Sequence, residues 1–249
     1  MATTVPAAAR TLAVFEIFAR EKRELTKSEV ARLLDLPESS CSDLLGTLEE
    51  LGYLSRTVYS KRYYPTGRLT GIADAISQHD EVHALAIEAT AMLGERTGES
   101  CYMGELDGQA VRIIATRDSV HPLRYVAQVG DRVAIHATAI GKALLAGLPV
   151  AERARMLRLA PLRALTDATK TRPEQVEEEI LAHKAGGWYQ AVGEGRYGLS
   201  SLAIAGWCGQ RYLGLSITGP SDRIQPHHDR YIEHLLAVQE KVFGTIAAA

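Results

Sequence analysis

Between residues 25 and 52 the apolar positions follow a helical period twice, with a break between the two runs. Thr26 is a good N-cap for the first run, and Glu29, three residues later, completes a capping box. Pro37 interrupts the pattern, because the residue before a proline avoids helical dihedrals and proline suits the first turn of a helix. The second run ends at Gly52, a typical C-cap, and its apolar face is Cys41, Leu44, Leu45, Leu48 and Leu51. The pattern predicts two short helices joined by a sharp turn.

The opposite face of the second helix carries short polar side chains, namely Ser39, Ser40, Ser42 and Thr47. Short side chains let a helix approach the major groove of DNA, and their hydroxyls can meet bases or phosphates. An ordinary helical hairpin packed in a core has the same period. The helix pair alone therefore leaves both interpretations open.

Residues 53–65 read YLSRTVYSKRYYP, which is typical of two strands with a hairpin tip at Ser60 and Lys61. From residue 53 to residue 68 there are four basic side chains and no acidic one. A helix pair followed by a basic hairpin indicates a winged helix-turn-helix, in which the wing lies along phosphates. The alternative is a solvated charged hairpin. The candidate DNA contacts are Lys27, Ser39, Ser40, Ser42, Thr47, Arg56, Lys61 and Arg62.

Further helices are expected on both sides of this unit. Residues 10–20 form an amphipathic helix that would pack on the pair, and the residues before it are expected to be a frayed tail. A linker helix carries Leu69, Ile72 and Ile76 at helical spacing. We expect a winged helix-turn-helix domain over residues 1–66, the linker helix over 67–80 and a second domain over 81–249.

The second domain begins with a helix over 82–96, and from residue 99 the apolar period changes to two. Asp107 and Gly108 predict a hairpin turn. Strands are expected over 122–129, 199–207 and 211–219, and helices within 136–148, 150–159, 173–185 and 229–245. The third of these helices carries Glu177, Glu178 and Glu179, which we interpret as a solvated face. Strands and helices without a regular βαβ alternation predict an α+β domain with a largely antiparallel sheet.

Composition and charge limit the kinds of protein that this chain can be. The chain has 249 residues, 46% of them hydrophobic and 23% charged, as in ordinary globular proteins. The net charge is −2, and the first 70 residues hold ten basic and nine acidic side chains, so DNA contact requires a local basic patch. Three distant cysteines fit a reducing cytoplasm, and we expect neither a signal peptide nor a membrane span.

The short motifs that could indicate catalysis or cofactor binding mostly lack the sequence context that they require. Gly193, Gly195 and Gly198 form a literal G-x-G-x-x-G that neither follows a strand nor opens a helix, so dinucleotide binding is not expected. The sequence at Gly141 lacks the earlier glycine of a phosphate loop. Residues 227–229 read HHD, which would cap the last helix rather than ligate a metal. We therefore expect no enzyme, no cofactor and no metal.

Three segments together resemble the IclR family of bacterial transcriptional regulators. They are LPESSCSDLLGTLEELGYL with RYYPTGRL, then VGDRVAIHATAIGKALLAGLP, and then GLSSLAIAG with YLGLSITGP. The resemblance covers about residues 10–244. It implies a winged helix-turn-helix, a GAF-like α/β effector domain, operator DNA and a small organic effector as partners, and a dimer or dimer of dimers that represses or activates.

The chain departs from the family's pattern in three places. Asp43 stands where a basic residue is usual in the recognition helix. Residues 190–193, QAVG, replace a frequent acidic cluster, and Ser201 replaces a common cysteine. The last two changes fall around the expected pocket, so the effector need not be that of a familiar relative.

The effector pocket is expected where a strand at Tyr125, a helix start at Ala139 and Ile140, and two later strands converge. The first N–H groups of a helix lack partners and favour an anion, so a carboxylate fits there even without an arginine. The candidate pocket residues are Tyr125, Val133, Ala139, Ile140, Leu199, Ser201, Ala203, Ser216 and Thr218. A small carboxylate, with an aromatic acid favoured, is the expected effector. The alternative is that these hydroxyls bond locally in a packed interior.

Two other functions compete with a ligand-responsive regulator. One is a small-molecule enzyme with an accessory winged domain, which would need an acid, base or nucleophile constellation. The other is a protein-interaction module that uses the winged domain for partners. Salt-dependent affinity for duplex DNA would separate the regulator from both.

Overall fold

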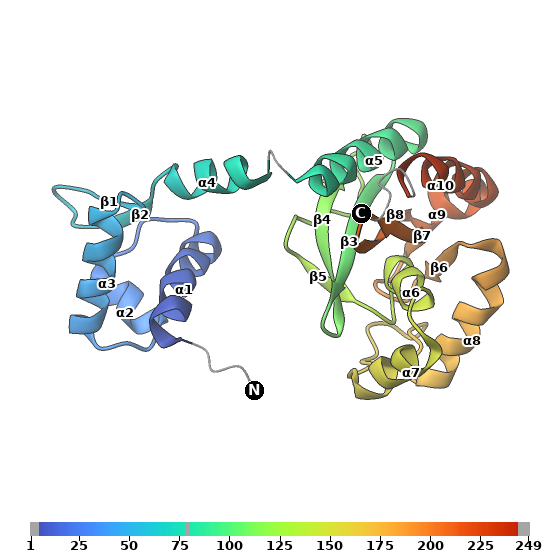
Figure 1. Ribbon diagram of the computed structural model, residues 1–249, viewed down its shortest axis with the longest axis horizontal. Helices are drawn as coiled ribbons and strands as arrows, with labels where there is room; N and C mark the ends of the chain where they lie inside the picture. Colours follow the sequence, from blue (N-terminus) through green and yellow to red (C-terminus); the bar gives the residue numbers. More distant parts are fainter. Residues whose placement is uncertain (1–4, 78–79, 244–249) are drawn as a thin grey trace. The chain divides into compact units, whose positions relative to one another are not determined.

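The computed structural model describes residues 5–77 and 80–243, and the chain divides into two compact units, Met1–His79 and Asp80–Ala249 (Figure 1). The first unit contains α1 (Pro6–Glu21), α2 (Lys27–Leu33), α3 (Glu38–Glu50), β1 (Leu54–Arg56), β2 (Tyr63–Pro65) and α4 (Arg68–Ser77). The helix pair followed by a two-stranded hairpin confirms the winged helix-turn-helix. Its core draws on α1, α2, α3 and both strands, all within residues 14–63.

Local sequence accounts for the helix ends in this unit. The Thr26 side chain accepts from the Glu29 N–H at 3.3 Å, and the Glu29 carboxylate accepts from the Thr26 N–H at 2.8 Å, as the capping box predicts. Pro37 is the N-cap of α3. The first helix begins at Pro6, so the expected frayed tail is wrong for residues 6–9. Proline suits a helix's first turn and the alanines that follow favour helix; residues 1–4 lie outside the described part.

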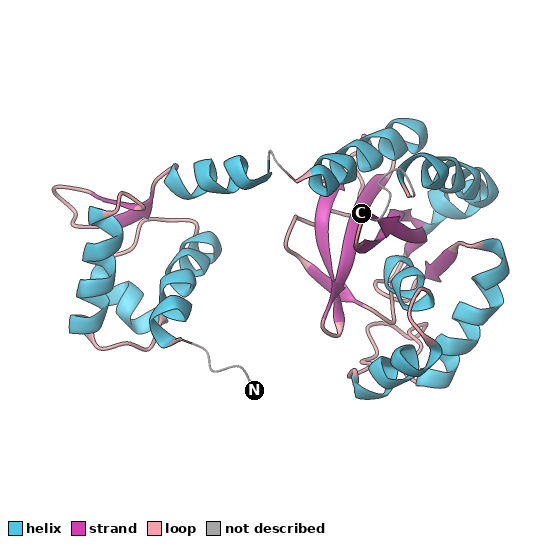
Figure 2. Cartoon of the chain, in the orientation of Figure 1, coloured by secondary structure: helices cyan, strands magenta, loops and turns pink. Residues whose placement is uncertain are grey.

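The second unit is an α+β domain around a six-stranded sheet (Figure 2). Its helices are α5 (Glu81–Thr97), α6 (Ala139–Ala146), α7 (Val150–Leu159), α8 (Pro173–His183), α9 (Ser221–Ile224) and α10 (His228–Val242). Its strands are β3 (Ser100–Asp107), β4 (Ala110–Arg117), β5 (Arg132–Ala134), β6 (Tyr189–Val192), β7 (Leu199–Cys208) and β8 (Arg211–Pro220). The order is β5-β4-β3-β8-β7-β6 and every pair is antiparallel, which confirms the predicted sheet type.

Helices cover both faces of this sheet. On one face α5 and α10 pack together over Met103, Ile204 and Leu215 (Figure 1). On the other face α6 lies over β7 and β8, with α8 beside it. Because side chains alternate along a strand, residues 201, 216 and 218 face α6 while 202, 215 and 217 face α5 and α10. The α6 face of the sheet therefore carries the hydroxyl-bearing residues Ser201, Ser216 and Thr218.

Several expectations for this unit are wrong. Tyr125 lies in an irregular segment rather than a strand, and β5 occupies the sheet edge beside β4 instead. The carbonyl of Tyr125 accepts from Ser100 and Tyr102 side chains, so side chains rather than a ladder satisfy its backbone. Strand β6 ends at Val192, directly before Gly193, so the expectation that the glycine-rich stretch does not follow a strand is wrong. The last helix ends at Val242, and residues 244–245 of the predicted helix lie outside the described part.

Candidate functional site

The polar side of α3 is open to solvent. Cys41, Leu45 and Leu48 are buried in the unit's core, and the other face exposes Ser39, Ser40, Ser42 and Thr47. A Cβ built on Gly46 would meet nothing within 4 Å, so this face is both uncrowded and made of small residues. Asp43 is exposed on the same helix, and its carbonyl accepts from the Thr47 hydroxyl at 2.8 Å. Because its side chains are small, this face lets the helix backbone approach a neighbouring surface closely.

The β1–β2 hairpin presents two exposed basic side chains, Arg56 and Lys61, with no carboxylate partner among the described residues. Arg56 lies with its guanidinium 5.3 Å from the Tyr63 ring centroid, across the strand pair from it. Lys61 is exposed and has a left-handed φ of 51°, which lets the chain reverse at the hairpin tip. Sequence reasoning missed Tyr59, whose side chain at the same tip is 99% exposed. Its position in the turn of a basic hairpin was the available signal.

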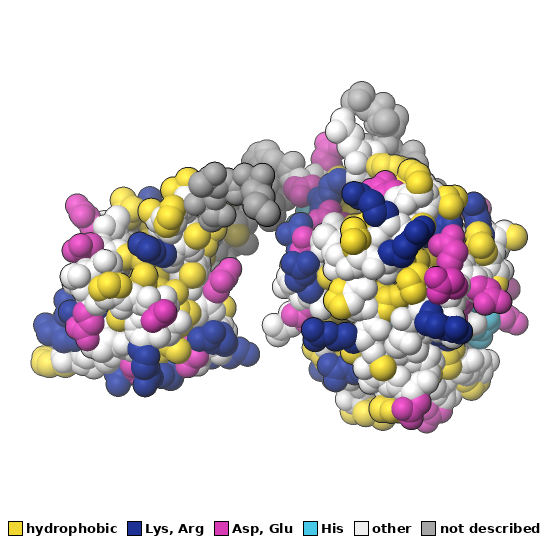
Figure 3. Space-filling view, turned by 90° about the horizontal axis from the view of Figure 1, so that it is seen from below, with side chains coloured by type: hydrophobic (Ala, Val, Ile, Leu, Met, Phe, Trp, Pro, Cys, Tyr) yellow, Lys and Arg dark blue, Asp and Glu magenta, His cyan; other side chains and the backbone are white. Residues whose placement is uncertain are grey.

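Two of the expected DNA contacts already have carboxylate partners. Arg62 lies 3.3 Å from Glu29, and Lys27 lies 3.4 Å from Glu38. The Thr26 N–H and then Arg23 stabilise the Glu29 carboxylate and lower its pKa to about 2. Acidic and basic side chains are interspersed on the face drawn in Figure 3. Arg62 and Lys27 would therefore have to exchange a carboxylate for a phosphate on binding DNA.

A cavity of about 370 Å³ opens on the α6 face of the sheet in the second unit. Seven of the nine expected residues line it, namely Tyr125, Val133, Ile140, Leu199, Ser201, Ser216 and Thr218. Ala139 and Ala203 do not line it; both are fully buried in the core between α6 and the sheet. The antiparallel register pairs Ser201 with Thr218, which brings two hydroxyl-bearing residues to the same part of the wall.

The start of α6 is less open than expected. Ser201 accepts from the Ala139 N–H at 3.3 Å, and Thr138, the N-cap, accepts from the Gly141 N–H at 3.2 Å. Of the first three amides, only that of Ile140 has no hydrogen-bond partner in the described residues. Ser216 also bonds locally, donating to the Tyr102 carbonyl at 3.4 Å. The expected locally bonded hydroxyls and the expected pocket are thus both present.

Two arginines line the cavity, and sequence reasoning had included neither. Arg132 is bound to Asp107, with one nitrogen 3.2 Å from its carboxylate. Arg196 lies over the Tyr125 ring at 5.7 Å from its centroid, and no carboxylate in the described residues pairs with it. Arg196 belongs to the glycine-rich stretch that had been set aside as a turn. Of the two cavity arginines, Arg196 is therefore the one whose guanidinium can pair with an anion.

The aromatic part of the wall is neutral. Tyr102 donates its hydroxyl to the Tyr125 carbonyl at 2.7 Å, and the two rings meet edge to face. Burial raises the pKa of Tyr102 to about 12, so it stays protonated. Ile113 and Leu165 add apolar lining. Apolar walls with a few placed polar groups are characteristic of small-molecule sites.

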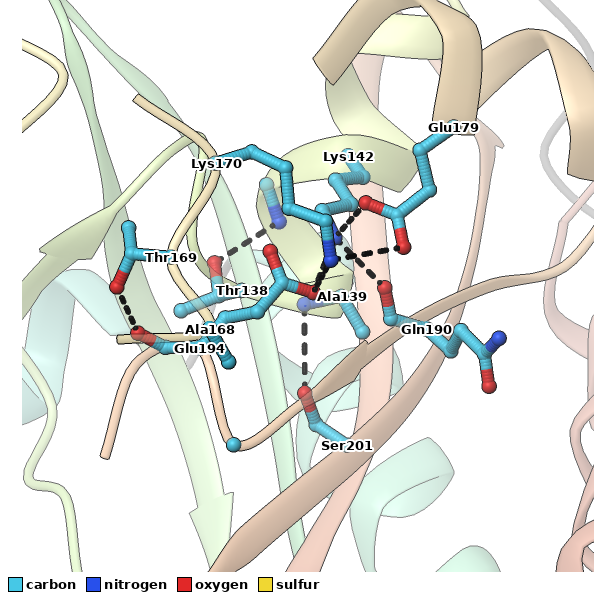
Figure 4. A network of polar contacts seen from close by, with 12 residues as sticks. Thr138, Ala139, Lys142, Ala168, Thr169, Lys170, Glu179, Gln190, Glu194 and Ser201 are labelled. Atoms are coloured by element: carbon cyan, nitrogen blue, oxygen red, sulfur yellow. Dashed lines mark hydrogen bonds and ion pairs between the residues drawn. The ribbon is translucent and has the colours of Figure 1, made fainter. Parts of the chain in front are cut away.

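A buried charge cluster lies beside the cavity (Figure 4). Lys142 lies 2.6 Å from Glu194 and 2.5 Å from Glu179, and Lys170 lies 3.4 Å from Glu194. The prediction that the glutamates of α8 form a solvated face is therefore wrong for Glu179. It is also wrong for Glu177, which pairs with the buried Arg153. The partners lie far apart in sequence, so no local pattern revealed them.

Other kinds of site receive no support from the described residues. Within 5–77 and 80–243, no group of three or more His, Cys, Asp or Glu side chains is placed to hold a metal ion. No helix in these ranges is long and apolar enough to cross a membrane. His227 is the N-cap of α10, but its side chain makes no capping hydrogen bond.

The chain matches known regulators along most of its length. Residues 74–243 match the model of the bacterial transcriptional regulator IclR C-terminal domain, and residues 7–57 match the IclR helix-turn-helix domain. The HTH-type transcriptional regulator BhcR of Paracoccus denitrificans is 31% identical over 88% of this chain and 80% of its own. The glycerol operon regulatory protein of Streptomyces griseus is 28% identical, over 96% and 94% respectively.

The fold has solved counterparts as well. The crystal structure of an IclR transcriptional regulator from Alicyclobacillus acidocaldarius superposes with a TM-score of 0.81. The match covers 96% of this chain and 98% of that one at 24% identity. Both units of the present chain are thus accounted for by one family, and the chain belongs to the IclR family of bacterial transcriptional regulators.

Proposed function

We propose that this transcriptional regulator binds operator DNA through α3 and the β1–β2 hairpin, and that a small organic acid in the second unit's cavity modulates the binding. The observation that carries the effector half of the proposal is Arg196, which has no carboxylate partner among the described residues, in the wall of a cavity whose other arginine, Arg132, is paired with Asp107. Arg196 is itself exposed, and its unpaired guanidinium in the cavity wall fits an anionic ligand, because arginine binds carboxylates through charge-assisted, often bidentate hydrogen bonds.

On DNA, Ser39, Ser40, Ser42 and Thr47 would face the major groove. Lys61 and Arg56 would meet phosphates directly, and Arg62 and Lys27 would do so after leaving their carboxylates. Tyr59, at the tip of the hairpin, would lie against the sugar-phosphate backbone. We expect a mobility shift with the DNA upstream of the protein's own gene.

The salt dependence of DNA affinity tests the wing. Each lost phosphate contact should flatten the slope of log affinity against log salt by about one unit and weaken all sequences alike. We expect this for Lys61→Ala and Arg62→Ala, with a smaller effect for Arg62 because of its Glu29 partner. Arg230→Ala, an exposed arginine of α10 in the second unit, is the control. Unchanged slopes for both wing variants would overturn the assignment.

For the effector, we propose a small carboxylate, with an aromatic acid favoured. Arg196 would meet the acid, Ser201 and Thr218 would supply hydroxyls, and Tyr125 would lie against a ring. An IclR homologue from Microbacterium hydrocarbonoxydans was crystallised with 4-hydroxybenzoate and superposes with a TM-score of 0.81 at 20% identity. That supports an aromatic acid as the first compound to try.

Calorimetry with a panel of aliphatic and aromatic acids tests this site. The best acid should bind wild type and lose affinity on Ser201→Leu, which fills the wall, and on Arg196→Gln, which removes the cation. Arg155→Gln, an exposed arginine of α7, should bind as wild type does. Equal binding by wild type and both cavity variants would refute the location.

We further propose a homodimer or a dimer of dimers working in the cytoplasm, where chromosomal DNA lies. One recognition helix reads few bases, whereas a two-fold dimer reads two half-sites. Leu69, Ile72 and Ile76 are exposed on α4, which makes that helix the candidate contact between DNA-binding units. Relatives named as transcriptional regulators and the lack of a catalytic constellation in the described residues favour a regulator over an enzyme.

A further inference from the structure

Lys142 and Glu194 form an ion pair that is closed off from solvent. Their side chains are 1% and 0% exposed, and the Lys142 ammonium also donates to the Gln190 carbonyl at 3.0 Å. With Glu179 and Lys170 they form a cluster of two cations and two anions, so the buried charges are balanced. Burying charges is costly even when they are paired, so such a pair is weak evidence for stability alone.

Glu194 begins the segment that enters the cavity wall. The two residues after it, Gly195 and Arg196, line the cavity. Gly193 and Gly198, on either side, have φ values of 66° and 71°, so the segment is bounded by two left-handed turns. Within the described residues the Arg196 side chain makes no hydrogen bond or ion pair, and its guanidinium lies over the Tyr125 ring. The placement of Arg196 is therefore set by its backbone.

Three side chains hold this segment, and two of them, Thr169 and Lys142, are labelled in Figure 4. Thr166 donates to the Gly193 carbonyl at 2.6 Å, and Thr169 donates to the Glu194 carbonyl at 2.6 Å. The third is Lys142 of α6. Its ammonium donates to the Glu194 carboxylate at 2.6 Å. The first turn of that helix contributes Ile140 to the same cavity. The ion pair thus joins two parts of one wall.

We propose that the Lys142–Glu194 pair is a positioning device that fixes residues 194–196 against α6 and so holds Arg196 where it meets the effector's acid group. Lys142 and Glu194 act through Arg196 and do not touch the ligand. The proposal rests on the proposed function in one respect, the contact between Arg196 and an anion. The positioning of the segment in the ligand-free protein can be tested separately.

The chain offers a control in a second ion pair, in which Arg153 is buried and Glu177 is partly exposed. Arg153 on α7, with a side chain 1% exposed, donates to Glu177 on α8 at 2.8 Å. Neither residue lines the cavity. Lys142→Met/Glu194→Gln and Arg153→Met/Glu177→Gln each remove one positive and one negative charge. The two double variants therefore share the loss of an ion pair and differ in which segment is released.

The first readout is trypsin cleavage after Arg196 in the full-length protein without ligand. Proteolysis of a native loop follows the population of its locally open form. We expect cleavage of the Arg196–Tyr197 bond to be about tenfold faster in Lys142→Met/Glu194→Gln than in wild type, which corresponds to a tenfold larger open population. The control variant should cleave there at nearly the wild-type rate. Equal rates in the two double variants would overturn the positioning role.

The second readout is a double-mutant cycle with Arg196→Gln, measured by calorimetry with the acid of the panel that binds wild type best. Losing the pair should weaken binding about tenfold with Arg196 present and by less than about twofold in its absence, because a residue that acts through Arg196 couples to it. Additive losses would mean that the pair is only structural. If no acid binds wild type, the proposed ligand class fails, while the trypsin result still decides how the segment is held.

Discussion

Gly141 occupies a position in α6 where a side chain has no room. A Cβ built there would lie 2.1 Å from the Ile135 carbonyl oxygen, which is backbone and cannot turn aside. We predict that Gly141→Ala lowers the free energy of unfolding of the second unit by about 1–3 kcal/mol, as overpacking does. Urea denaturation of wild type and variant would measure it.

Gly46 provides the control for that substitution. It lies inside α3, and a Cβ there would meet nothing within 4 Å. Alanine should therefore stabilise the first unit by about 0.5–1 kcal/mol, because glycine loses more backbone freedom on folding. If Gly141→Ala were as benign as Gly46→Ala, the close approach of α6 to residue 135 would be wrong.

Glu29 links the capping box to pH. Its pKa falls from 4.5 to about 2 in the folded chain, mainly through the Thr26 N–H and then Arg23. Since the folded pKa lies below the unfolded one, ionised Glu29 stabilises the first unit above about pH 4.5, and this contribution is lost as the pH falls towards 2. We predict that Glu29→Gln is less stable than wild type at pH 7.

The measurement is the urea midpoint of the first unit from pH 7 down to pH 2. The difference between wild type and Glu29→Gln should shrink across the window from 4.5 to 2 and vanish below it. Glu50→Gln, at the exposed end of α3, serves as the control. A difference that stays constant with pH would mean that the lost stability does not come from the charge.

At the scale of elements, Lys142 connects three parts of the fold. It lies on α6 and pairs with Glu179 of α8 and with Glu194, in the segment after β6. Removing it alone leaves Glu194 buried beside Lys170 only, and breaking a buried pair in this way costs about 3–5 kcal/mol. Glu194→Gln should cost less, because Lys142 keeps Glu179 at 2.5 Å. We predict this order of stability in thermal unfolding. The reverse order would contradict the pairing seen here.

Local signals in the sequence predicted the elements that local forces build. The capping box at Thr26, the break at Pro37 and the period of two in β7 and β8 all concern residues near one another in the chain. Strand β6 was missed because it is only four residues long and is recognised by its pairing with β7. Tyr125 was assigned to a strand because its composition favours one, although Ser100 and Tyr102 hold its carbonyl.

The residues of the candidate site also fall into two groups: those that a local pattern predicts and those that depend on distant segments. Alternation placed Leu199, Ser201 and Ala203 on one side of their strand, and Ser216 and Thr218 on one side of theirs. The pairing of Ser201 with Thr218 in the structure puts both sets on the same face of the sheet. The charge cluster was invisible because Lys142 lies 37 residues from Glu179 and 52 from Glu194 in sequence. Arg196 was overlooked for a related reason: its role depends on which distant segments enclose the cavity.

For the whole molecule, the open question is how many copies act together. Leu69 and Ile72 are each 39% exposed on α4 and Ile76 is 69% exposed, a helical stripe of the kind that marks an interaction surface. We predict a dimer or larger species by sedimentation at micromolar concentration. Ile72→Lys/Ile76→Lys should weaken this association, because it places charge within the contact.

Thr70→Lys adds a charge to another exposed position of the same helix and should leave association unchanged. A wild type that sediments as a monomer, with and without DNA, would refute the oligomer. A double variant that associates as wild type does would move the contact to another surface.

The first unit's core lies within residues 14–63, and the three clusters of the second lie within residues 82–243. No side chain serves both sets. Mutations that reshape the cavity can therefore accumulate without loosening the helices that read DNA, and the reverse holds as well. If a ligand in the cavity modulates DNA binding as proposed, natural selection can change that ligand while the target promoter stays the same. Duplicated copies could diverge into sensors of different small molecules while each still binds its original promoters.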